Sequence, residues 1–178
     1  MSVENFDPVA LAEQGKQEYA KGNHASAAGF FLQAAQAYKS AQDDLNAAEM
    51  MNNQSVALLK AGKAKDALEA TEGTEEIFQK AGDMKRQGIA VGNRAAALEG
   101  LKKTDEALAE YERAAVLLEE AGEGDMHSVV RKAAANLNFK RGRVTAAQMD
   151  VYDSLRLVEK PNFTQRIMKF LKRIGFIR

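Results

Sequence analysis

Cysteine is absent from this chain of 178 residues, and proline occurs only twice, at Pro8 and Pro161. Without cysteine, the chain can form neither a disulfide nor a metal site built on thiolates. Proline interrupts helices, so its absence between these two positions leaves a long stretch in which helices can form. Alanine is the most abundant hydrophobic residue and has the highest helix propensity. We therefore predict an all-helical protein.

Long apolar runs are also missing, since no segment of 18 consecutive apolar residues occurs. A helix that spans a membrane needs about 20 such residues, so we expect no transmembrane segment. The first ten residues, MSVENFDPVA, have neither the basic nor the apolar region of a signal peptide. These absences favour a cytoplasmic protein.

Charge is balanced over the whole chain but is distributed unevenly. The 25 basic residues match the 25 acidic residues, yet residues 160–178 hold six basic residues and no acidic one. The rest of the chain therefore carries a net charge of about −6. A basic tail follows an acidic body.

A repeat of 40 residues organises the body. It is marked by four alanines at the same spacing, which are Ala27, Ala67, Ala107 and Ala147. Each unit is expected to contain a first helix, a turn and a second helix. The alanine would lie where the two helices cross, because close helix packing needs a small side chain there. Acidic residues between the units, such as Asp43 and Asp83, are expected to begin the next first helix.

Glycine marks the turn inside three of the units, at Gly22, Gly62 and Gly142. Glycine readily adopts the left-handed conformation that often ends a helix. The third unit has Lys102 at this position, and we expect Gly100, two residues earlier, to shift the turn.

The residues of the first unit resemble the tetratricopeptide repeat family, in which small, aromatic and alanine residues recur at fixed offsets. They are Gly15, Tyr19, Gly22, Ala27, Phe31 and Ala34. The family repeat is about 34 residues long, so this chain is similar to its branch with longer repeats. The resemblance covers about residues 8–160 and is expressed most weakly in the fourth unit.

The resemblance implies an α-solenoid of about four antiparallel helix pairs in a right-handed superhelix. It also implies that the first helices line a concave groove that receives a peptide or a protein segment. Amide side chains suit a peptide backbone, because they both donate and accept hydrogen bonds. The residues expected in the groove are Lys16, Tyr19, Asn52, Asn53, Asn93, Lys132, Asn136 and Phe139.

The tail, residues 161–178, is expected to form a basic amphipathic helix after a repeat array that occupies residues 1–160. Three interpretations stay open. The helix could cap the last repeat, bind an anionic membrane surface, or enter an acidic groove of its own or a neighbouring chain and so support self-association. The residues expected to contact lipid or a partner are Phe163, Arg166, Ile167, Lys169, Phe170, Lys172 and Arg173.

No catalytic motif is found in the sequence. His24 and His127 lie in different repeats, and the glutamate pairs fit solvated helix faces. The acidic body and the short basic stretch argue against nucleic acid as a partner. We therefore expect a non-enzymatic adaptor that binds a protein partner without a cofactor or a metal. The alternative is an adaptor at the membrane periphery, attached through its tail.

Overall fold

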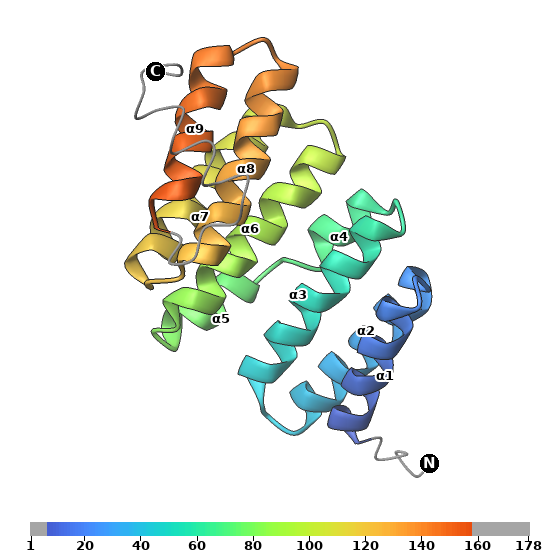
Figure 1. Cartoon of the computed structure of the whole chain (residues 1–178). Helices are drawn as coiled ribbons and strands as arrows, with labels where there is room; N and C mark the ends of the chain where they lie inside the picture. The colour runs from blue at the N-terminus through green and yellow to red at the C-terminus, as the bar shows by residue number, and fades with distance from the viewer. Residues whose placement is uncertain (1–6, 158–178) are drawn as a thin grey trace.

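The computed structural model describes residues 7–157, and every regular element in this range is an α-helix (Figure 1). The helices of the successive units follow one another in chain order. The helices are α1 (Pro8–Ala20), α2 (His24–Ser40), α3 (Asp44–Lys60), α4 (Ala64–Glu69), α5 (Thr74–Lys80), α6 (Met84–Gly100), α7 (Thr104–Glu120), α8 (Gly124–Lys140) and α9 (Val144–Arg156).

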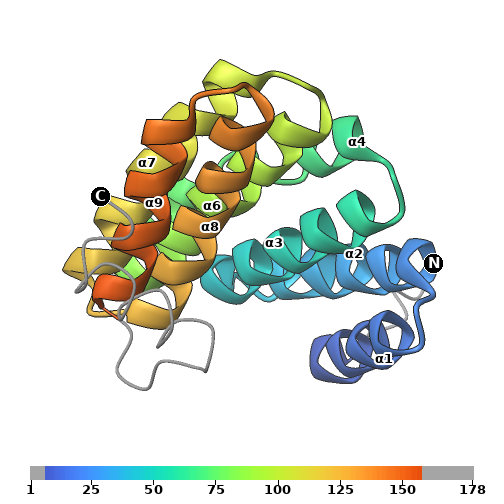
Figure 2. The same cartoon turned by 45° about the horizontal axis from the view of Figure 1, so that its top comes forward.

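Consecutive helices pack against each other along the chain, which confirms the predicted α-solenoid. Unit 1 consists of α1 and α2, unit 2 of α3 to α5, unit 3 of α6 and α7, and unit 4 of α8 and α9. Helices α1 to α3 lie together at one end, while α6 to α9 form the other end (Figure 2). The predicted helix at residues 161–178 lies outside the described residues.

The four repeated alanines are all buried, as the sequence predicts. Ala27 and Ala67 belong to an apolar cluster of the first two units, and Ala107 belongs to a cluster of units 3 and 4. Small residues at such positions let the two helices of a unit approach each other closely. A Cβ atom on Gly88 of α6, for example, would lie 2.8 Å from Cγ of Leu118 in α7.

The turn inside unit 3 differs from the prediction. Lys102 itself adopts the left-handed conformation, with φ of 61°, so Gly100 does not shift the turn. Gly100 is instead the last residue of α6 and packs against unit 2. A Cβ atom there would lie 2.9 Å from both Leu59 Cδ1 and Ala64 Cβ. Gly100 is thus needed for a close approach between units, which its position in the sequence did not reveal.

The second helix of unit 2 is split in two, although the repeat predicts a single second helix in each unit. It breaks between α4 and α5, where Gly73 has φ of 74°. The hydroxyl of Thr71 donates to the carbonyl oxygen of Leu68 at 2.7 Å, and that of Thr74 donates to the carbonyl oxygen of Thr71 at 2.9 Å. The same two carbonyl oxygens also accept the backbone N–H groups of Thr71 and Thr74, so each threonine is bonded through both its backbone and its side chain at the break.

Acidic residues begin two of the first helices, as predicted. The carboxylate of Asp43 accepts a hydrogen bond from the backbone N–H of Asn46 at 3.0 Å, and that of Asp83 accepts one from Arg86 at 2.9 Å. Both bonds hold the pKa of the aspartate below its usual value. Such caps fix the residue at which each helix begins.

Ion pairs join units 2, 3 and 4. Arg86 pairs with Glu49 at 3.3 Å, and Arg113 pairs with Glu75 at 2.6 Å, both between units 3 and 2. Units 3 and 4 are joined in the same way, for example by Lys85 and Glu123 at 2.9 Å. Within residues 7–157 no such pair links unit 1 to unit 2, whose junction is apolar.

Candidate protein-interaction surface

Two asparagines of the predicted groove lie at the same position in successive first helices. Asn53 in α3 and Asn93 in α6 are half-buried. Neither side chain makes a hydrogen bond to the part of the chain that the structure describes. Both amides therefore keep their full capacity to donate and accept.

The groove residues of α1 are already engaged within the chain. Lys16 is exposed and lies 3.6 Å from Glu13. Tyr19 is half-buried, and its ring centroid lies 4.9 Å from that of His24. An ion pair between exposed side chains is weak, so Lys16 stays accessible to a ligand.

Asn52 does not lie on an accessible surface, contrary to the prediction. Only 5% of this residue is exposed, and its Oδ1 atom is buried without a hydrogen-bond partner among residues 7–157. The equivalent residue in unit 3 is Gly92, where a Cβ atom would lie 3.2 Å from Cγ1 of Val130 in the next unit. This position faces the following unit, so we remove Asn52 from the residues that could contact a ligand.

Lys132, Asn136 and Phe139 of α8 are exposed, and 66% of Phe139 is accessible. Lys132 occupies the same position as Asn52 and Gly92, which face the following unit. Phe139 occupies the position of Leu59, which lies against Gly100 of unit 3. The three residues therefore belong to the C-terminal end of the described array, which we call the end face.

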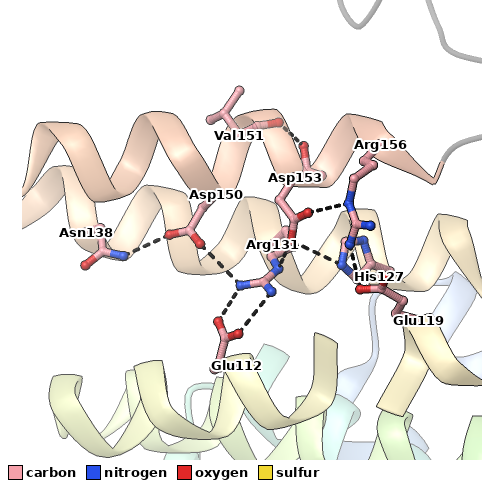
Figure 3. A network of polar contacts seen from close by, with 10 residues as sticks. Glu112, Glu119, His127, Arg131, Asn138, Asp150, Val151, Asp153 and Arg156 are labelled. Atoms are coloured by element: carbon pink, nitrogen blue, oxygen red, sulfur yellow. Dashed lines mark hydrogen bonds and ion pairs between the residues drawn. The ribbon is translucent and has the colours of Figure 1, made fainter. Parts of the chain in front are cut away.

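A polar network occupies the interior of unit 4 and is centred on Arg131 of α8 (Figure 3). Its guanidinium pairs with Glu112 of α7 and contacts Asp153 and Asp150 of α9 at 2.6 and 3.5 Å. Asn138 donates a hydrogen bond to Asp150 at 2.9 Å. Helices α7, α8 and α9 are thus held together by charges.

Burial, hydrogen bonds and the charge of Arg131 together set the pKa values of the two aspartates in this network. Burial raises the pKa of Asp150, although Asn138 and Arg131 act in the opposite direction. Asp153 is also partly buried, but hydrogen bonding to Arg156 and the charge of Arg131 hold its pKa below the usual value. Both carboxylates depend on Arg131 for part of their stabilisation.

His127 lies beside this network and is completely buried. Its Nε2 atom is 3.5 Å from Asp153, and neither ring nitrogen has a hydrogen-bond partner in the described part of the chain. Burial lowers the pKa of His127, and Asp153 opposes this shift only in part. The ring is therefore neutral near pH 7.

Sequence reasoning missed this network. Arg131 stands where units 2 and 3 have Met51 and Val91, and Asn138 stands where they have Leu58 and Leu98. A comparison of the units at these buried positions would have revealed the change from apolar to polar residues. The charged groups of the network pair with one another, which indicates a role in packing unit 4 rather than in binding a ligand.

Among the described residues, no group of three or more histidine and carboxylate side chains is placed to hold a metal ion. None of the helices within residues 7–157 has both the length and the apolar character needed to cross a membrane. The predicted lipid or partner contacts of the tail, from Phe163 to Arg173, lie outside the described residues.

The fold and the surface define a helical-repeat protein of the tetratricopeptide type, built to contact other proteins. A sequence model of one family, the soluble NSF attachment protein (SNAP) family, matches residues 11–171. The chain therefore belongs to the SNAP family. No curated protein matches it. The fold predicted from the resemblance is confirmed at the level of a helical repeat, while the narrower assignment to a 40-residue subtype stays a prediction.

Proposed function

We propose that this chain is a non-enzymatic adaptor that binds a protein partner along its first helices. One observation carries the proposal: a family whose name describes attachment proteins for NSF matches 11–171, almost the whole α-solenoid. Repeat arrays present extended surfaces to partners. An NSF-like protein is accordingly the first partner to test.

The proposed contact surface is the groove side of α3 and α6. Asn53 and Asn93 are 40 residues apart, half-buried and free of hydrogen bonds to other described residues. Free amides at a regular spacing can bind the backbone of an extended peptide segment. Lys16 extends this surface at α1, and half-buried Tyr19 offers an apolar ring beside it.

The test compares two double variants. Asn53→Ala with Asn93→Ala removes both amides, and Gln33→Ala with Gln79→Ala removes two exposed amides from second helices. Partners are first captured from the native host with the wild-type chain and identified. Each purified partner is then titrated against the three proteins by calorimetry.

We expect the asparagine variant to weaken binding by about tenfold or more, since each lost hydrogen bond contributes about 0.5–1.5 kcal/mol. The glutamine variant should bind like the wild type. Equal affinity of all three proteins, with unchanged helicity, would show that the partner does not contact these amides.

A further inference from the structure

The end face exposes positions that are covered in the other units. Lys132 is exposed, whereas its counterparts Asn52 and Gly92 are buried. In α9, Gln148 is exposed, whereas its counterpart Leu108 packs against the apolar cluster of units 3 and 4. The difference arises because each earlier unit is followed by another first helix within the described range.

The chain continues beyond the end face for the length of one more first helix. The helices α3, α6 and α8 begin at residues 44, 84 and 124, so the next first helix in this series would begin at residue 164. Residues 164–178 would supply 15 of the usual 17 residues of such a helix. The family match also continues into this segment, up to residue 171.

The sequence of the segment fits this position. Six first-helix positions are buried in both α6 and α8, and the segment fills them mostly with apolar residues. These are Ile167, Met168, Phe170, Gly175, Ile177 and Arg178. Three of its basic residues fall at positions that are exposed in α8, which are Arg166, Lys169 and Lys172.

We infer that residues 164–178 dock on the end face as the first helix of a fifth unit. Phe170 then lies against Lys132, because the equivalent pair in the structure is Val130 and Gly92. The apolar side of the segment packs against α8 and α9, and its basic side faces solvent. A docked segment has no apolar side left for lipid.

A disulfide can test this contact without background, since the chain contains no cysteine. At the equivalent pair, a Cβ atom on Gly92 would lie 3.2 Å from Cγ1 of Val130. The Cβ atom of Val130 is one bond from Cγ1, so the two Cβ atoms are near the separation that a disulfide needs, which is about 3.5–4.5 Å. We therefore expect Lys132→Cys with Phe170→Cys to form a bond within one chain on mild oxidation.

The matched control is Lys132→Cys with Lys172→Cys. Position 172 is the counterpart of position 132 itself, so its side chain points away from α8 and should not react. The products are separated on non-reducing gels, with and without dithiothreitol. The inference would be overturned if the cysteines at 132 and 170 stay unbonded, if both cysteine pairs react equally, or if the bond forms between two chains.

A second measurement keeps Phe170 in place. In the single variant Lys132→Cys, the docked segment should slow maleimide labelling several-fold relative to the single variant Lys172→Cys. Adding Phe170→Asp should remove that protection. Circular dichroism checks that the helices of this variant stay folded. Equal labelling rates of Lys132→Cys with and without Phe170→Asp would refute docking.

Binding to vesicles tests the alternative that the apolar side of the segment contacts lipid. The wild-type chain is mixed with vesicles of phosphatidylcholine and phosphatidylserine and sedimented. We expect it to stay in the supernatant. Sedimentation that is abolished by Phe170→Asp, which changes the apolar side and keeps all the basic residues, would assign that side to the membrane and overturn docking.

Discussion

Replacing Arg131 by methionine tests whether charges hold unit 4 together. Methionine is the residue at the same position in unit 2, Met51, so a helix of this repeat accommodates its shape. The side chain of Arg131 is only 13% exposed, and those of Asp150 and Asp153 are 14% and 22% exposed. The substitution leaves two nearly buried carboxylates without their shared cation.

The size of the stability loss depends on which contacts the partners of Arg131 keep in the variant. Breaking a fully buried ion pair costs about 3–5 kcal/mol. Here Asp150 keeps its bond from Asn138 at 2.9 Å, and Asp153 keeps Arg156 at 2.8 Å. Glu112 is mostly exposed and loses little. We therefore expect a loss of about 2–3 kcal/mol in the free energy of unfolding, which lowers Tm by about 5–10 °C in a protein of this size.

Thermal unfolding followed by circular dichroism measures this loss. The control is Arg94→Met, because Arg94 is half-exposed and lies 3.9 Å from Glu110. It should change stability by less than about 0.5 kcal/mol.

The loss should also depend on pH. Burial raises the pKa of Asp150 in the folded chain, so the folded state takes up a proton there before the unfolded state does. Protonation removes the unpaired charge, and the loss in Arg131→Met should shrink as the pH falls from 7 towards 4. Adding Asp150→Asn should restore part of the stability at pH 7. A Tm within 1–2 °C of wild type, or a loss independent of pH, would refute the reasoning.

Three further predictions concern stability. Ala107→Leu should destabilise by about 1–3 kcal/mol through overpacking of a buried helix crossing, and a wild-type Tm would contradict that position. Lys102→Gly should stabilise by about 0.5–1 kcal/mol in urea unfolding, because Lys102 has φ of 61°; a loss of stability would argue against this conformation. Burial lowers the pKa of His127, so the unfolded state binds its proton first and stability should fall as the pH drops below about 6.5. In His127→Gln, which copies Gln87 of unit 3, Tm should fall less between pH 7 and 5, and an equal fall in both proteins would exclude His127 as the cause.

The sequence predicted the features that depend on a regular spacing. The helix pairs and the buried alanines such as Ala107 recur every 40 residues, and the capping residues Asp43 and Asp83 have the same spacing, so one unit indicates the next.

Local irregularities escaped prediction. Gly73 stands where units 1 and 3 have Gln33 and Arg113, which are ordinary helix residues, so the repeat predicts no break there. Lys102 adopts the left-handed conformation at a position where glycine is the usual residue.

The contact surface stays a prediction. Asn53 and Asn93 are half-buried, whereas the adjacent Asn52 is buried at a position that faces the next unit. One helix position separates a surface side chain from a buried one, since successive residues point about 100° apart. The polar network around Arg131 was missed because a charged residue in a helical pattern is normally assigned to the solvent side.

The uneven distribution of ion pairs along the array has a mechanical consequence. Ion pairs bridge units 2 to 4, whereas within residues 7–157 no ion pair joins units 1 and 2, which share an apolar cluster. Screening by salt weakens exposed charge pairs and leaves apolar contacts intact. The junctions between units 2, 3 and 4 should therefore bend more easily as ionic strength rises, while the junction between units 1 and 2 keeps its stiffness.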